Sequence, residues 1–329
     1  MPARSGLGTS DVLLLGASGN SGALIGAELA ARGLSVRLAG RRRAPVDDLV
    51  RTLTARGASA QACTVDVDEP DSLSAALGGA GVVLNTVGPF TRHAGPVVTA
   101  CLAAGIPYVD IANEFPAVWG LLERDGDARE RGVPLVTGAG FGPAATETLV
   151  LRLVEDLDGT PLRVRVAAAA AVTRRSEGVT RTITAALGQG AITYREARLV
   201  HEPLGSGATV LTFGGAARPV FPAPVGDLEA ARRASGAADV VAYQQDPSAR
   251  TPGTDSFAWA EVTGPDGRIR TAELRVGEGV RATAAIAAET ARRVLAGAAP
   301  GAWTPGGLFG TALVPQASGA RITVDGEPA

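Results

Sequence analysis

The stretch Asp11-Val-Leu-Leu-Leu-Gly-Ala-Ser-Gly-Asn-Ser-Gly22 decides the fold. Val12 to Leu15 is a short apolar run, which is typical of a central parallel strand buried on both faces. The glycines then have the spacing GxxGxxG. The first permits a tight turn, the second lets the backbone approach a pyrophosphate, and the third allows close helix packing. The predicted phosphate-binding residues are Gly16, Ala17, Ser18, Gly19, Asn20, Ser21 and Gly22.

The residues after this turn complete a βαβ unit that binds a dinucleotide. A helix from about Ser21 to Arg32 would direct its free N–H groups at the phosphates. A second strand, Leu34 to Gly40, ends at three arginines, where sites for NAD usually hold an Asp or Glu. A guanidinium matches phosphate geometry and stacks on adenine. We therefore assign Arg41 and Arg42 to the 2′-phosphate of NADP(H), and expect Arg43 in solvent.

Two further strand ends are expected to border the cofactor. The third strand, Ala60 to Val65, leads to Asp66 and Val67. We expect these two residues either beside the adenine or in an acidic cluster that starts the next helix. The fourth strand, Gly81 to Thr86, ends where ligands bind in such a sheet. The residues expected near the nicotinamide ribose and the substrate cleft are Asn85, Thr86, Val87, Gly88, Pro89 and Phe90.

The alternation of strands and helices predicts the fold class. It continues to about Asp158, which is typical of a Rossmann fold, an α/β architecture with a doubly wound parallel sheet. The pattern then changes to an α+β region with an antiparallel sheet, where the turn signal Gly264-Pro-Asp-Gly267 separates two strands. The expected helices are 96–104, 117–131, 144–157, 176–188 and 281–295, the last of which could return to the first domain.

The domain organisation follows from this change of pattern. We expect an NADP-binding Rossmann domain over residues 1–158 and an α+β domain over 159–279. A C-terminal helix and tail over 280–329 are expected to return to the Rossmann domain.

Composition excludes several classes of protein. The 329 residues are 46% hydrophobic and carry a net charge of −2, which can fill a large core and gives no reason to expect nucleic acid. No apolar stretch is long enough to span a bilayer and no secretory signal is visible, so a cytoplasmic protein is expected. No Cys/His cluster has zinc spacing, so no metal is expected. The chain has no lysine, which excludes Schiff-base catalysis.

Several segments of the chain form a set. They are 16–22, 39–41, 82–90 with Gly95, Cys101-Leu-Ala-Ala-Gly-Ile-Pro-Tyr-Val-Asp-Ile-Ala-Asn-Glu114, 138–142, Ser176-Glu-Gly-Val-Thr180, 217–224, 283–284 and 290–293. Together they resemble the saccharopine-dehydrogenase-like reductases, and especially the trans-acting enoyl reductase branch. The resemblance spans nearly the whole chain and is most specific in the nucleotide-binding part.

The resemblance implies a Rossmann domain, an α+β substrate and oligomerisation domain, and hydride transfer from a nicotinamide cofactor. The implied partner is a small-molecule substrate, either free or bound to a carrier protein, and a homodimer is considered. Two departures lie where substrate would meet cofactor. Asn113 replaces the usual glycine before Glu114, and Gly142 stands where an acid is common.

Few side chains could donate a proton opposite the nicotinamide. His93 has a near-neutral reference pKa, but it could equally start a helix or lie in solvent. Glu114 could bind a substrate amine, act as an acid or cap a helix. Tyr194 could reach the cleft, although a tyrosine in the core or on the surface is the more common case. Water can protonate the product of an enoyl reduction, so no catalytic residue is assigned.

Three functions are therefore compared. The resemblance favours an NADPH-dependent reductase of an activated C=C bond in a polyketide- or lipid-like metabolite. Reduction of a C=N bond, as in saccharopine formation, or of a C=O bond is the alternative within the same chemistry. A protein that binds NADP(H) without turnover, as a redox sensor, is the alternative from another class.

Overall fold

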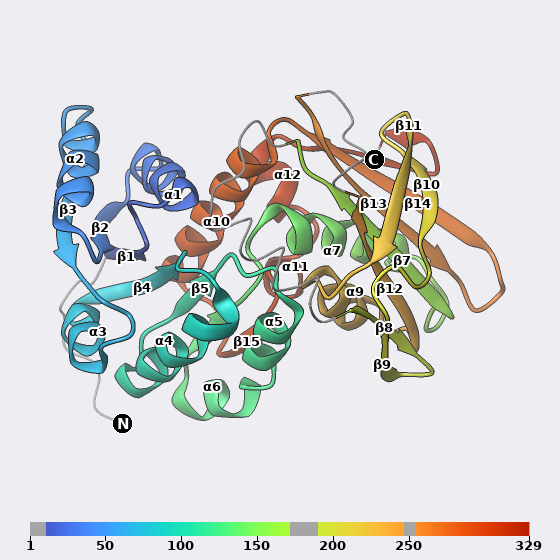
Figure 1. Cartoon of the computed structure of the whole chain (residues 1–329), viewed down its shortest axis with the longest axis horizontal. Helices are drawn as coiled ribbons and strands as arrows, with labels where there is room; N and C mark the ends of the chain where they lie inside the picture. The colour runs from blue at the N-terminus through green and yellow to red at the C-terminus, as the bar shows by residue number, and fades with distance from the viewer. Residues whose placement is uncertain (1–10, 172–189, 247–253, 329) are drawn as a thin grey trace.

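The computed structural model describes residues 11–171, 190–246 and 254–328. Within them the chain forms two β-sheets that lie beside each other (Figure 1). The predicted helix at 176–188, with the segment Ser176–Thr180, lies outside the described residues.

The first sheet has seven strands, all paired in parallel. In sheet order they are β15 (Gly301–Trp303), β6 (Pro134–Val136), β5 (Tyr108–Asp110), β4 (Ala80–Asn85), β1 (Asp11–Leu15), β2 (Ser35–Gly40) and β3 (Ala60–Thr64). The chain moves outward from β1 to β3 and then crosses to β4 on the other side of β1. Ligands bind above the carboxyl ends at such a switch point. The predicted doubly wound sheet is confirmed.

Helices cover both faces of this sheet. One face carries α1 (Asn20–Ala31), α2 (Arg43–Thr54) and α10 (Gly279–Ala296), and the other α3 (Pro70–Leu77), α4 (Phe90–Ala104), α5 (Phe115–Leu122) and α6 (Asp125–Arg131). Although α10 comes late in the chain, it packs beside α1 and against β4 and β5. Its buried alanines, among them Ala287 and Ala288, belong to the same apolar cluster as Ile25 and Leu29 of α1. The expected return of this helix to the first sheet is thus observed.

The second sheet has ten strands and is mixed, but mostly antiparallel. Its main path is β10 (Thr209–Phe213), β11 (Ala216–Pro222), β12 (Asp239–Gln245), β7 (Arg163–Ala169), β13 (Ser256–Thr263), β14 (Ile269–Val276), β16 (Arg321–Val324) and β17 (Glu327–Pro328), with β8 (Ala191–Arg195) and β9 (Arg198–Glu202) attached to β12. Only β7 and β12, among the strand pairs of this sheet in the described residues, run in parallel. The turn at Gly264–Gly267 joins β13 and β14 as predicted.

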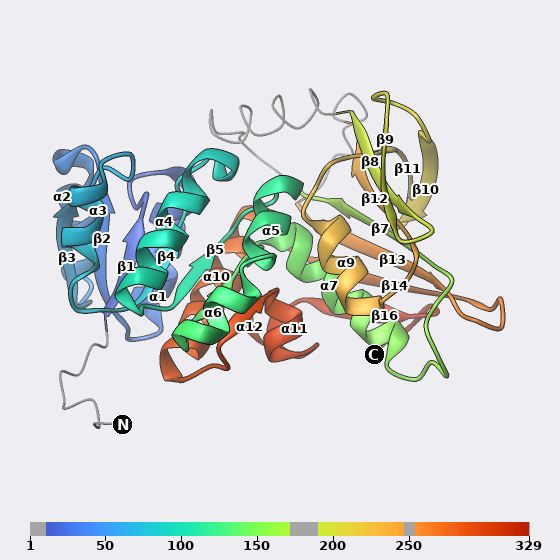
Figure 2. The ribbon, with the colours of Figure 1, turned by 90° about the horizontal axis from the view of Figure 1, so that it is seen from below.

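Two helices lie between the sheets. They are α7 (Phe141–Val154) and α9 (Asp227–Ser235), and Figure 2 shows them against the second sheet. One face of that sheet, with Val164 and Val166 of β7, packs on Leu149 and Val150 of α7. Since α7 begins directly after the loop that follows β6, it connects the core of the second sheet to the carboxyl edge of the first. Two short helices also contact α7, namely α11 (Pro305–Phe309) and α12 (Leu313–Ser318).

Two predicted helices have different bounds. The helix expected at 96–104 begins at Phe90, so Pro96 lies inside α4. The side chain of Phe90 is buried, and the backbone N–H of Phe90 donates a hydrogen bond to the Glu114 carboxylate. These tertiary contacts outweigh the local tendency of Pro96 to end a helix. The helix expected at 117–131 is two helices, because α6 starts anew at Asp125 with acidic residues in its first turn.

The sequence patterns missed several elements. Strands β8 and β12 and helix α9 were not predicted, and the glycine-rich tail contains β15 and β16. β15 pairs with β6 in the first sheet, while β16 pairs with β14 in the second. The tail is therefore shared between the sheets, and the domain boundaries stay a prediction. Over the ranges that the structure describes, none of the helices combines the length and apolar character needed to cross a membrane.

Candidate cofactor and substrate site

Two glycines of the turn between β1 and α1 have no room for a side chain. Gly16 has φ +79°, and a Cβ there would lie 2.6 Å from the hydroxyl oxygen of Thr86. A Cβ on Gly22 would lie 2.2 Å from the carbonyl oxygen of Gly16. The first glycine therefore permits the turn, and the second lets α1 pack directly behind it.

The outer side of this turn is open. Ser18, Gly19 and Asn20 are exposed, and α1 has no side-chain cap hydrogen bond among the described residues. A Cβ on Gly19 would meet only the Gly16 carbonyl oxygen, at 3.2 Å, within a 4 Å radius. The first N–H groups of a helix lack helical partners and attract anions. The turn can therefore hold a diphosphate.

The arginines after β2 lie next to this turn. A Cβ on Gly40, the last residue of β2, would lie 3.4 Å from the Ser18 hydroxyl oxygen. Arg41 and Arg42 are exposed and form no ion pair with any residue in the described ranges. Arg43 differs, because its guanidinium donates to Asp47 at 2.8 Å. Two uncompensated guanidinium groups beside a diphosphate site suit a further phosphate.

The loop after β3 forms the next part of this edge. The Asp66 carboxylate accepts a hydrogen bond from the N–H of Asp68 at 3.1 Å, just before α3 begins. Val67 is buried in the same apolar cluster as Phe90. The alternative of an acidic cluster at a helix start thus has a geometric basis. A contact of Asp66 with adenine stays a prediction.

A buried polar network fixes the carboxyl ends of β4, β5 and β6. The Asn85 amide donates to the Tyr108 hydroxyl at 3.1 Å, and that hydroxyl donates to Asp110 at 2.9 Å. Asp110 also accepts from the Thr137 hydroxyl and from the N–H of Gly138. Burial raises the pKa of Asp110 to about 6, although these hydrogen bonds oppose the shift. The side chain of Asn85 thus holds the strand ends together, and a contact of this residue with the nicotinamide ribose stays a prediction.

The residues after Asn85 lie at the switch point. The N–H of Val87 donates to the Asn85 side chain, and the Thr86 hydroxyl donates to the carbonyl oxygen of Leu15 at 2.7 Å. The second of these bonds joins the end of β4 to the end of β1. Gly88 is exposed and Pro89 is half-buried, so this turn borders the crevice.

Glu114 is buried and links two helix starts. Its carboxylate accepts from the N–H of Phe90 at 3.0 Å and from the N–H of Asn113 at 3.2 Å. Its backbone is the N-cap of α5 and bridges to Val225. The carboxylate therefore has a structural role at the start of α4, whereas α5, the helix that the capping alternative meant, has no side-chain cap hydrogen bond within the described part of the chain.

His93 and Tyr194 lie in different surroundings. His93, in the first turn of α4, has its Nδ1 3.2 Å from the carboxylate of Asp68. The Tyr194 hydroxyl donates to Glu229 at 2.8 Å, and its ring packs edge-on against Phe115. Burial, followed by the Glu229 carboxylate, raises the pKa of Tyr194 and makes it a weak acid. The three proton-donor candidates thus have separate partners, although Glu114 bonds the first turn of α4, which holds His93, and Tyr194 packs on Phe115, the residue after Glu114.

The two departures from the family pattern are neighbours in space. A Cβ on Gly142 would lie 3.2 Å from a carboxylate oxygen of Asp227 and 3.4 Å from the side-chain oxygen of Asn113. Asp227 is buried and accepts from the Thr146 hydroxyl at 3.0 Å. Burial raises the pKa of Asp227 to about 6. Asp227 was not predicted as a site residue, because it is the first residue of α9, a helix that the sequence pattern did not predict.

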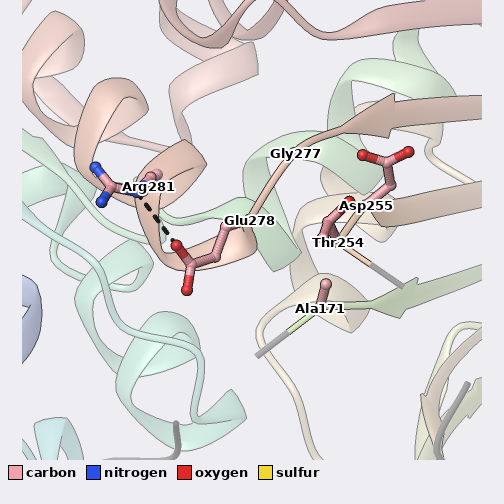
Figure 3. A pocket seen from close by; sticks show the side chains of 6 residues that line it. All are labelled: Ala171, Thr254, Asp255, Gly277, Glu278 and Arg281. Atoms are coloured by element: carbon pink, nitrogen blue, oxygen red, sulfur yellow. Dashed lines mark hydrogen bonds and ion pairs between the residues drawn. The ribbon is translucent and has the colours of Figure 1, made fainter. Parts of the chain in front are cut away.

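A pocket of about 280 Å³ lies where β14 leads into α10 (Figure 3). In it, Arg281 donates to Glu278 at 3.2 Å. The N–H of Phe141 donates to the hydroxyl of Thr283, so the first turns of α10 lie beside the loop after β6. The pocket is therefore on the carboxyl side of the first sheet, next to the second sheet. It is lined by Ala171, Thr254, Asp255, Gly277, Glu278 and Arg281, none of which the sequence had singled out.

The sheet and its glycine turn define a dinucleotide-binding protein of Rossmann type. Residues 12–136 match the family model described as the saccharopine dehydrogenase NADP binding domain. This part of the chain is therefore an NADP-binding domain of that kind, so the predicted cofactor, NADP(H), and the predicted resemblance are confirmed for residues 12–136.

Curated relatives agree with this assignment. A trans-acting enoyl reductase of Mycobacterium tuberculosis is 33% identical over 156 residues, which cover 45% of this chain and 37% of that protein. The corresponding protein of Mycobacterium leprae is 31% identical over the same length. The chain thus matches little more than a third of the length of these relatives.

A solved structure resembles the whole fold. Apo histidine-tagged saccharopine dehydrogenase (L-Glu forming) from Saccharomyces cerevisiae superposes with a TM-score of 0.65 at 15% identity. The alignment covers 96% of this chain and 99% of that chain. The predicted fold class, a Rossmann sheet followed by an α+β part, is confirmed by this likeness.

Proposed function

We propose that this chain is an NADPH-dependent reductase that transfers hydride to an activated C=C bond of a polyketide- or lipid-like small metabolite. The observation that carries the proposal is the similarity, over 156 residues, to proteins named trans-acting enoyl reductases. The open glycine turn supports NADPH as the hydride source, as do Arg41 and Arg42, which form no ion pair among the described residues, because these features suit a diphosphate and a further phosphate.

NADPH, when bound, supplies the hydride. The N–H groups at the start of α1 bind the diphosphate, and Arg41 with Arg42 holds the 2′-phosphate. The turn 86–89 borders the nicotinamide ribose, and the buried network of Asn85, Tyr108 and Asp110 keeps this strand end in place. We place the acceptor between this turn and the pocket at the start of α10.

The proton comes from water in this proposal. Hydride adds to the β-carbon, the π electrons move onto the conjugated carbonyl oxygen, and the resulting enolate takes a proton at its α-carbon. Among the candidate acids, Glu114 is engaged with backbone N–H groups and Tyr194 with Glu229. Because both groups are hydrogen-bonded within the protein, we favour solvent water as the proton donor.

Turnover assays on the purified chain test the proposal. We expect loss of NADPH absorbance with α,β-unsaturated acyl thioesters, both free and attached to a carrier protein. With NADPH deuterated at C4, mass spectrometry should find the label at the β-carbon of the product. Saturated thioesters serve as the control and should cause no oxidation.

Two other outcomes would contradict C=C reduction. Turnover only with imines or ketones would assign the hydride to a C=N or C=O bond. Tight NADPH binding without turnover on any of these acceptors would favour a redox sensor.

A further inference from the structure

A cluster of charged side chains remains outside the roles assigned above. It consists of Asp68, in the loop after β3, with Arg92 and His93 in the first turn of α4. The Arg92 guanidinium donates to one Asp68 oxygen at 3.0 Å, and His93 Nδ1 lies 3.2 Å from the other. The His93 side chain is only 11% exposed, whereas that of Arg92 is 68% exposed.

The position of this cluster in the sheet relates it to the cofactor. In sheet order, β4 and β3 lie on either side of the neighbouring strands β1 and β2. A contact between the loop after β3 and the start of α4 therefore passes the carboxyl ends of β1 and β2. The glycine turn and Arg41 come from those two strand ends. The pocket beside the loop after β6 lies toward the other end of the sheet.

We propose that His93 determines cofactor specificity at the adenosine end of the site, where Asp68 positions it and where its protonated form attracts the 2′-phosphate of NADPH. The inference rests on the proposed NADPH site and assigns His93 to the cofactor rather than to proton transfer. Arg41 supplies a permanent charge at this end, and His93 adds a charge that depends on pH.

The charged groups around His93 set the direction of this dependence. They are Asp68 from the β3 loop, Arg92 from α4 and Arg41 from the end of β2. Burial lowers the pKa of His93 below its usual 6.5, Asp68 opposes this shift, and the two arginines add to it. At a given pH, His93 is therefore charged less often than a free histidine. A bound phosphate would stabilise that charge and raise the pKa.

Binding measurements at several pH values test the proposal. NADPH and NADH affinities are measured from nucleotide fluorescence between about pH 5.5 and about pH 8, the range in which histidine titrates. As the pH falls over this range, the ratio of NADPH affinity to NADH affinity should rise in the wild type by a factor about fivefold larger than in His93→Gln. The expected factor is modest because one added charge acts on the phosphate across a screened site. The phosphate of the nucleotide itself titrates in this range, but equally in both proteins.

The second histidine of the chain provides a matched control. His201 is exposed on β9, in the second sheet, and His201→Gln should keep the wild-type pH dependence. An unchanged dependence in His93→Gln would overturn the proposal. Failure of the wild type to bind either nucleotide would instead overturn the proposed cofactor site itself.

Titration of the imidazoles by NMR gives an answer that does not depend on the His93 variant. The chain has only two histidines, so His201→Gln assigns both signals. NADP⁺ should raise the pKa of His93 more than NAD⁺ does, and neither should move His201. Equal shifts with both nucleotides would show that the 2′-phosphate is not near His93.

Discussion

At the scale of single residues, the adjacent arginines after β2 differ in their partners. Arg41 and Arg42 are exposed without an ion pair among the described residues, while Arg43 bonds Asp47. We expect Arg41→Ala with Arg42→Ala to weaken NADPH binding by about 10- to 100-fold, because a charge-assisted bond to phosphate contributes roughly 1.5–3 kcal/mol. NADH binding should change little. Isothermal calorimetry with both nucleotides measures this.

Arg43→Ala is the control for that pair. It removes the same guanidinium from the next position, so it should leave the preference for NADPH intact. Equal loss of NADPH and NADH affinity in the double variant would show that the 2′-phosphate binds elsewhere.

The glycines of the turn make a second prediction at this scale. Gly19→Val should reduce NADPH affinity at least tenfold without unfolding the protein, because its Cβ meets only one carbonyl oxygen and the methyl groups point toward the diphosphate site. Gly95→Ala, within α4 and with no atom near its Cβ position, should bind NADPH normally. Fluorescence titration and circular dichroism separate the two effects. Normal binding by Gly19→Val would remove the diphosphate from this turn.

At the scale of elements, Glu147 joins α7 to α11. Its buried carboxylate accepts from the Thr304 hydroxyl and from the N–H groups of Gly306 and Gly307. Burial raises its pKa to about 7. The folded state thus binds this proton more tightly than the unfolded state, so the stabilisation is complete below the unfolded pKa and is lost as the pH rises through 7.

This linkage predicts how stability changes with pH. The free energy of unfolding should fall by on the order of 3 kcal/mol between about pH 4.5 and about pH 8 because of Glu147. Glu147→Gln should reduce this slope, whereas Glu155→Gln, exposed just after the same helix, should not. Urea denaturation at several pH values measures the slope. A slope unchanged in Glu147→Gln would contradict the assignment.

At the same scale, elements formed by residues close in the sequence could be predicted, whereas roles that depend on contacts between distant segments could not. The strand, turn and helix around Gly16 and Gly22 follow from spacing, because the required contacts lie within a few residues. The roles of Asn85 and Asp110 depend on side chains from three strands, which spacing does not reveal. Likewise, α4 begins at Phe90 because Glu114, from another loop, bonds its N–H.

At the scale of the whole molecule, α10 unites the two halves. It follows β14 of the second sheet, yet Ala288 is buried in the apolar cluster shared with α1. Ala288→Leu should lower the free energy of unfolding by about 1–3 kcal/mol, because added methylenes overpack a close helix pair. Ala296→Leu, at the exposed last residue of α10, should have little effect. Equal stability of the two variants in urea would show that this helix contact is loose.

The second half of the chain was harder to predict than the first, because several of its strands lack a clear local sequence pattern. Two strands that were missed, β8 (Ala191–Arg195, AITYR) and β12 (Asp239–Gln245, DVVAYQQ), show no regular alternation of apolar and polar residues. The hairpin of β13 and β14 was predicted because its turn residues are local. The joining of β16 to β14 connects distant segments and has no local signature.

The late position of β15 and α10 has a consequence for synthesis on the ribosome. When the nucleotide-binding half emerges from the exit tunnel, β6 is an open sheet edge and the apolar face beneath α10 is bare. That half cannot reach its final form until the residues that follow β14 have also been translated. A nascent chain arrested before α10 should therefore recruit chaperones and fail to retain coenzyme, whereas release of the finished chain should let both halves close together.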